Sequence, residues 1–152
     1  MDVTPANSPT EPPHPWLPPW AVWVAERPLI FYPLLALLAA ILFLPGQAEV
    51  PPLDRDEPRF AQASSQMVES GDYVEIAFQD EPRLKKPIGI YWLQSAAVIL
   101  TAPDDPAEIW VYRLPSLIGA VLSVLLAAAI GRVLFAGAVG AIGGALFATA
   151  IL

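Results

Sequence analysis

Long uncharged, mainly apolar stretches alternate with charged segments along this chain. No charged residue lies between Arg27 and Glu49, between Arg113 and Arg132, or after Arg132. A helix of roughly 20 apolar residues can cross the hydrocarbon core of a bilayer. The pattern therefore predicts an all-α polytopic membrane protein with transmembrane helices at 28–48, 109–131 and 133–152, the last two separated by a turn at Gly131-Arg132.

The chain before the first apolar stretch is rich in proline. Seven prolines in the first 19 residues predict a disordered or polyproline-like tail over 1–27. Trp16, Trp20 and Trp23 mark an expected membrane–water interface, which tryptophan favours. A secretory signal peptide cleaved near Ala48 is the rival interpretation of the apolar stretch, but a long preceding region with Arg27 as its only basic residue argues against it.

The segment 49–108, between the first two predicted spans, contains two expected helices. The first, 57–70, has proline in its first turn and Gly71 just past its end. The second, 87–100, is apolar but too short to span, which is typical of an interfacial or re-entrant helix. The first has one apolar face, which we expect to lie on the membrane, made of Phe60, Ala63, Met67 and Val68.

Between these helices, Tyr73-Val74 and Ile76 are expected to be extended. In the last apolar stretch, Gly140 and Gly144 form a small-residue pair that predicts close helix packing in lipid. That stretch runs uncharged to Leu152, so we expect the sequence to be the N-terminal part of a longer protein.

Composition and charge narrow the function. The mean hydropathy is +0.51, 55% of residues are hydrophobic, and the absence of cysteine excludes disulfides and thiolate metal sites. The net charge of −7 gives no basic footprint for nucleic acid, so nucleic-acid binding is set aside. Counted alone, the five cations between 55 and 86 would put the loop in the cytoplasm, although this rule weakens for long loops.

Two groups of charges in the loop are candidates for chemistry. The first is Asp54-Arg55-Asp56-Glu57-Pro58-Arg59. Acids at a helix start have an ordinary role, since they cap free N–H groups and suit the helix dipole, and Asp54 with Glu57 has capping-box spacing. The functional alternative is that one carboxylate acts as a general base toward an acceptor hydroxyl.

The second group is Arg83-Leu84-Lys85-Lys86-Pro87, directly before the second expected helix. Cations beside free N–H groups at a helix start make a good phosphate site. The alternative is simple contact with anionic lipid headgroups. A base for an acceptor and cations for a leaving phosphate are together what transfer from a sugar phospholipid requires.

The stretch DEPRFAQASSQMVESGDYV, followed by PRLKKPIGIYWLQSAAV, resembles the first extracytoplasmic loop of the GT-C type membrane glycosyltransferases. Among these it resembles the lipid A aminoarabinose transferase and dolichyl-phosphate-mannose protein mannosyltransferase-like family. The resemblance covers about residues 54–98. It implies a GT-C-like transmembrane bundle with an inside N-terminus and residues 49–108 outside, in a bacterial plasma membrane.

The resemblance also implies roles for individual residues. Asp56 and Glu57 correspond to the catalytic-loop acids, and Arg59 and Lys86 to cations expected at the donor phosphate, with Lys85 beside them. Several relatives have an acid where this chain has Lys85, so a metal contact there has no support, and no cofactor is assigned. Tyr91 and Trp92 are candidates for lining the path of the lipid or sugar. The alternative is that these aromatic side chains anchor the helix at the membrane interface.

The sequence thus predicts a glycosyltransferase that moves a sugar from a polyprenyl-phosphate donor to a lipid or protein acceptor. We expect residues 1–152 alone to have no transferase activity, because most of the expected membrane bundle would lie after Leu152. The alternative is a non-enzymatic small membrane protein whose acidic loop docks a partner. A transporter fragment is disfavoured, because the predicted spans have charges only at their ends.

Overall fold

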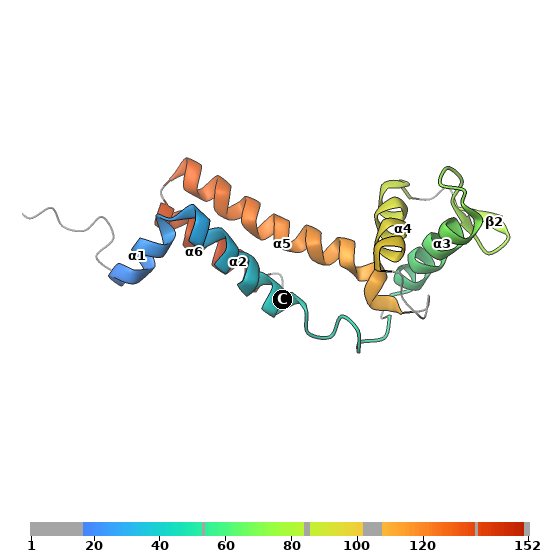
Figure 1. Ribbon diagram of the computed structural model, residues 1–152, viewed down its shortest axis with the longest axis horizontal. Coiled ribbons are helices and arrows are strands. Elements are labelled where there is room, and N and C mark those ends of the chain that lie inside the picture. Colours follow the sequence, from blue (N-terminus) through green and yellow to red (C-terminus); the bar gives the residue numbers. More distant parts are fainter. Residues whose placement is uncertain (1–16, 53, 84–85, 102–107, 136, 151–152) are drawn as a thin grey trace, which may run out of the picture.

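The computed structural model describes residues 17–52, 54–83, 86–101, 108–135 and 137–150. These residues form six α-helices and one two-stranded antiparallel hairpin, so the expected helical class is confirmed (Figure 1). The elements in chain order are α1 (Pro19–Ala25), α2 (Pro28–Phe43), α3 (Asp56–Ser70), β1 (Ala77–Phe78), β2 (Glu81–Pro82), α4 (Gly89–Thr101), α5 (Ile109–Leu134) and α6 (Gly137–Ala150).

The molecule is elongated, with two groups of elements joined by one long helix. Figure 1 shows α1, α2 and α6 gathered along one end of α5, while α3, α4 and the hairpin lie at its other end. The segment after α2 runs without regular secondary structure alongside α5 toward the start of α3. The described residues of the 49–108 loop therefore fold into a unit that packs on the first turns of α5.

The apolar end is held together by a buried cluster of large and small apolar residues. Leu35 of α2, Val124 and Ala128 of α5 and Ala148 of α6 are buried in one cluster. A Cβ atom added at Gly144 would lie 2.7 Å from Ala128 Cβ. The predicted close packing of this glycine face is therefore confirmed, and it occurs within the chain, between α6 and α5.

Of the described helices, α5 alone is long and apolar enough to cross a membrane. The predicted first span ends at Phe43 rather than at 48, because Pro45 follows and Gly46 takes a left-handed φ of 82°. With 16 residues α2 is about 24 Å long, shorter than a hydrocarbon core of about 30 Å. α1 and α2 qualify only together, as a pair bent by 99°.

The turn predicted at Gly131-Arg132 was wrong, because α5 continues through both residues to Leu134. A single glycine costs a helix only about 1 kcal/mol, so it does not end one by itself. The side chain of Arg132 is used in packing instead: it donates to the carbonyl of Ala25 and lies 5.4 Å from the ring of Phe31. The last helix is correspondingly short, with 14 residues.

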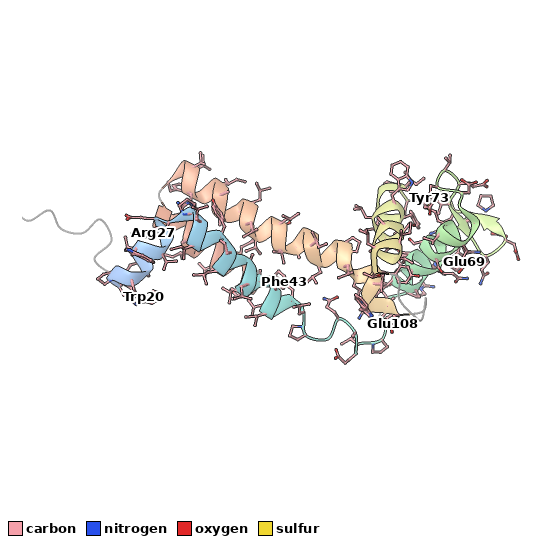
Figure 2. The ribbon with its side chains drawn as sticks, in the orientation of Figure 1. Trp20, Arg27, Phe43, Glu69, Tyr73 and Glu108 are labelled. Carbon is pink, nitrogen blue, oxygen red and sulfur yellow. The ribbon has the colours of Figure 1, made fainter. Side chains whose placement is uncertain are left out.

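Helix α1 carries two of the tryptophans predicted to mark an interface. Trp20 and Trp23 are exposed, and the guanidinium of Arg27 lies 4.0 Å from the ring of Trp23. Figure 2 shows Trp20 and Arg27 at the end of the molecule opposite the α3–α4 unit. Trp16 lies outside the described residues, as does most of the proline-rich tail.

The two helices predicted in the loop are confirmed as α3 and α4, but two details differ. Arg55, already in helical conformation, occupies the N-cap of α3 without a side-chain cap in this described segment, so the expected capping by Asp54 was wrong. The apolar face of α3 packs against α4, where Ala63 and Met67 bury Tyr91, instead of facing a membrane. The end of α3 at a left-handed Gly71 is as predicted.

The extended segment lies later than predicted. Tyr73 and Val74 form a bend, and the short strands begin at Ala77. The reason is local: the Asp72 carboxylate accepts hydrogen bonds from the N–H groups of Val74 and Glu75, which folds this stretch into a turn.

Candidate functional site

Asp56, the first residue of α3, lies at the centre of a charge cluster. Its carboxylate is 3.7 Å from Nη2 of Arg83, 3.7 Å from Nζ of Lys86 and 4.0 Å from Nη1 of Arg59. The two charge groups singled out in the sequence therefore meet in space, although about 30 residues separate them. Lys85, the remaining predicted phosphate contact, lies outside the described residues.

The cluster carries more positive than negative charge, since three cations share one carboxylate. Lys86 and Arg59 are about half exposed, at 47% and 44% of their side-chain surface, so they face the solvent side. Exposed ion pairs of this length contribute little to stability, and an anionic ligand can displace them readily. The arrangement is therefore suited to binding a phosphate beside the Asp56 carboxylate.

Arg83 was predicted as part of the second charge group, but the sequence analysis gave it no role of its own. Its side chain is only 10% exposed, and its Nε donates to the hydroxyl of Tyr91 at 3.0 Å. The guanidinium also lies 5.6 Å from the ring of Phe60 and 5.7 Å from that of Phe78. Buried between two rings and Tyr91, Arg83 is a fixed cation behind Asp56. The sequence signal was its place as the first cation of Arg83-Leu84-Lys85-Lys86.

Glu57 points to a different partner. Its two carboxylate oxygens accept hydrogen bonds from Nε and Nη2 of Arg113 on α5, at 2.5 and 3.2 Å. The same guanidinium donates to the carbonyls of Gln47 and Val50, at 2.6 and 2.8 Å. Glu57 is thus engaged in holding α3 against α5, which favours a positioning role over the catalytic role implied by the resemblance.

A network of uncharged side chains fixes α3, α4 and α5 together behind the cluster. The hydroxyl of Ser64 donates to Oε1 of Gln94 at 2.8 Å, and Nε2 of Gln94 donates to the carbonyl of Tyr112 at 2.9 Å. Ser64 and Gln94 are buried, so these bonds are shielded from water. Sequence analysis missed this network, because buried Ser and Gln have no signature within one helix.

Tyr91 and Trp92 occupy different environments, since consecutive helical residues point about 100° apart. Tyr91 is fully buried against Phe60, with ring centroids 5.1 Å apart. Trp92 is 51% exposed and its indole N–H donates to the carbonyl of Tyr73 at 2.7 Å. Tyr91 therefore supports Arg83 from behind, and Trp92 faces outward at the edge of the unit.

A groove of about 740 Å³ opens beside the charge cluster, between the end of α2 and the starts of α3, α4 and α5. Its lining changes character along α5, from Arg113 to Leu117 and Ala120 on successive turns. The polar part also includes Asp54, Asp56, Glu57 and Gln47, and the apolar part Leu42, Phe43 and Pro45. The groove thus has a charged part, formed by three acids and Arg113, and an apolar part, and the cations that contact Asp56 lie just outside it.

One carboxyl group of the unit has a shifted proton affinity. Two backbone N–H groups, from Val74 and Glu75, hold the pKa of Asp72 below its usual value. This residue lies in the turn after α3, away from the groove, and its role is structural. In the described part of the chain, no three His, Cys, Asp or Glu residues are placed to hold a metal ion.

Comparison with protein-family models, with curated proteins and with solved structures found no match to this chain.

Proposed function

We propose that this chain binds the polyprenyl-phosphate-linked sugar donor of a membrane glycosyltransferase at the extracytoplasmic face. The observation that carries the proposal is the position of Asp56, which lines a groove with an apolar end and also contacts three cations that lie just outside the groove. A ligand that fits such a groove has an anionic head and a long hydrocarbon tail. Polyprenyl phosphates have both.

The apolar part of the groove supports a lipid ligand over a soluble phosphate compound. It lies between Leu42 and Phe43, at the end of α2, and Leu117 and Ala120 of α5. Because α5 is long and apolar enough to cross a membrane, this part of the groove would open at the level of the acyl chains. The phosphate would then sit at headgroup depth, beside Lys86 and Arg59.

In the proposed reaction, the oxygen of an acceptor hydroxyl attacks the anomeric carbon of the donor. The bond between that carbon and the phosphate oxygen breaks, and its electron pair leaves with the phosphate. Lys86, Arg59 and Arg83 stabilise the charge that develops there. The donor phosphate first binds the three cations, which frees the carboxylate of Asp56 from its ion pairs. The hydroxyl proton then passes to that carboxylate.

The proposed orientation is the one that the resemblance of the loop implies. α5 would cross a bacterial plasma membrane, with the α3–α4 unit on the outer surface and α1 at the inner interface. The exposed Trp20 and Trp23 of α1 suit a headgroup environment. With one bent pair and α6 beside α5, the apolar end would form the beginning of a GT-C-like bundle, and the acceptor would be a lipid or a protein.

The test is photo-crosslinking of a diazirine-bearing polyprenyl phosphate to the chain in membranes. We expect labelling of the wild type, and about tenfold weaker labelling of Lys86→Ala, because a charge-assisted phosphate contact is worth about 1.5–3 kcal/mol. Arg55→Ala is the matched control, since Arg55 is an exposed cation next to Asp56 but outside the cluster. Equal labelling of Lys86→Ala and wild type would overturn the proposal.

A further inference from the structure

A second cavity, the hairpin cavity, lies beside two of the arginines that contact Asp56. It has a volume of about 190 Å³ and is lined by Arg59, Phe78, Glu81, Pro82 and Arg83. Arg59 and Arg83 also contact Asp56, which lines the large groove. The two arginines line the hairpin cavity and Asp56 lines the groove, so their ion pairs connect the two spaces.

Hydrogen bonds within the chain fix the hairpin that lines this cavity. The side chain of Gln66 on α3 makes two hydrogen bonds to the backbone of Gln79 at the hairpin turn, at 2.9 and 3.1 Å. Gln79 has a left-handed φ of 58°, a conformation that costs a non-glycine residue energy and that these bonds compensate. The N–H of Arg83 donates to the carbonyl of Ile76 at 2.6 Å, which closes the hairpin. The hairpin is thus fixed to α3.

The lining of the cavity combines three kinds of group. The ring of Phe78 offers a flat apolar surface, the exposed carboxylate of Glu81 accepts hydrogen bonds, and the arginines donate them. A ring that carries hydroxyl groups on its edge and C–H bonds on its face matches these groups. The volume is too small for a prenyl chain, which the groove of about 740 Å³ can accommodate.

We propose that the hairpin cavity is the subsite for the sugar of the donor, with Phe78 and Glu81 as its specificity-determining residues. This inference rests on the proposed function. A phosphate held by Arg59 and Arg83 would direct its prenyl chain into the groove and its sugar into the hairpin cavity. The carboxylate of Asp56, which both arginines contact, then lies beside the bond that breaks.

The test is a competition experiment on the chain in membranes. The diazirine-bearing polyprenyl phosphate is the probe, and the competitors are sugar-free, hexosyl and pentosyl polyprenyl phosphates of the same chain length. We expect at least one sugar-bearing lipid to displace the probe from the wild type better than the sugar-free lipid does. Phe78→Ala and Glu81→Gln are expected to reduce that preference about tenfold, as the loss of about 1.4 kcal/mol of sugar contacts would.

Direct labelling by the sugar-free probe is expected to be unchanged in both variants, which also shows that they fold. Asp80→Asn is the matched control, because Asp80 is an exposed acid in the same hairpin turn that does not line the cavity. If the probe labels the wild type normally, two outcomes would overturn the subsite alone. One is that the wild type shows no preference for a sugar-bearing lipid, and the other is that both variants keep the wild-type preference. Absence of labelling in the wild type would overturn the proposed function and the subsite with it.

Discussion

Glu57 and Arg113 form a two-point ion pair between residues that lie 56 positions apart, at 2.5 and 3.2 Å. Because Arg113 also donates to the carbonyls of Gln47 and Val50, one guanidinium connects the segment after α2, the first turn of α3 and the start of α5. Asp56 is the neighbour of Glu57, so its position over the groove depends on this contact.

We expect Arg113→Ala to destabilise the chain by about 2 kcal/mol, because it leaves a carboxylate and two backbone carbonyls without their donor. Arg113→Lys should retain part of that stability, since an ammonium lacks the planar fork that reaches both carboxylate oxygens and the carbonyls together. Thermal unfolding in detergent measures the difference. An Arg113→Lys variant as stable as the wild type would contradict the importance of the fork.

The charge-swapped pair Glu57→Arg with Arg113→Glu separates the ion pair from the carbonyl contacts. The swap restores opposite charges between α3 and α5, but a glutamate at 113 cannot donate to Gln47 or Val50. Its stability should therefore exceed that of either single reversal and remain below wild type. If the swap is no better than the single changes, the ion pair contributes little and the carbonyl contacts account for the effect.

Asp56→Asn is expected to separate lipid binding from sugar transfer. The variant removes the negative charge that shares the three cations, so labelling by a polyprenyl phosphate should be equal to or stronger than that of the wild type. Transfer, assayed in membranes in which the wild type is active, should fall by about 10²–10⁴-fold, the usual contribution of a general base. Transfer at the wild-type rate would exclude Asp56 as the base.

Much of the arrangement of the loop followed from its sequence, and the parts that did not have physical reasons. Local signals were sufficient for α3, with its acidic first turn and its glycine end, and for α4, with its apolar run. The role of Glu57 was missed, because its partner Arg113 is remote in sequence and was assigned to the edge of a span. Long-range pairs of this kind have no local signature.

The boundaries of the apolar helices were predicted less well for a related reason. Hydropathy records where a chain can be buried, but it does not record where a helix ends. Pro45 and Gly46 end the α2 region early, whereas Gly131 and Arg132 remain helical because the Arg132 side chain finds a carbonyl partner on α1. In the candidate site, the cations were predicted as a group, but the burial of Arg83 became visible only with its packing.

The turn after α3 should depend on pH through Asp72. Its pKa is lowered by the N–H groups of Val74 and Glu75, so the folded state binds the proton less well than the unfolded chain does. The stabilisation is therefore fully present above the ordinary pKa of an aspartate and is lost as the pH falls through the lower, folded value. The backbone amide proton shifts of Val74 and Glu75, followed by NMR in detergent micelles, report this titration.

The titration midpoint of the Val74 and Glu75 amide shifts is expected below the ordinary pKa of an aspartate, and Asp72→Asn should abolish the titration. Asp80→Asn is the control and should leave it in place, since Asp80 makes neither of these two bonds. A midpoint at or above the ordinary value would show that the carboxylate does not hold the turn in solution.

The glycines of α6 permit a matched test of the apolar packing. A Cβ at Gly144 would lie 2.7 Å from Ala128 Cβ and 2.9 Å from Cδ2 of Leu35, whereas a Cβ at Gly143 would meet nothing within 4 Å. Gly144→Ala should therefore destabilise the contact of α6 with α5 and α2 by about 1–3 kcal/mol, the usual cost of overpacking. Gly143→Ala should be neutral or slightly stabilising, because alanine favours a helix over glycine by about 1 kcal/mol.

Each variant adds one methyl group to α6, at neighbouring positions. A difference in their stability therefore reports packing and not helix propensity. Thermal unfolding in detergent is the measurement, with proteolysis of α6 as a second reading of whether this helix detaches. Equal stability of the two variants would show that α6 does not pack through Gly144. The apolar end would then lack the close contact that fixes α2 beside α5, and with it one wall of the groove.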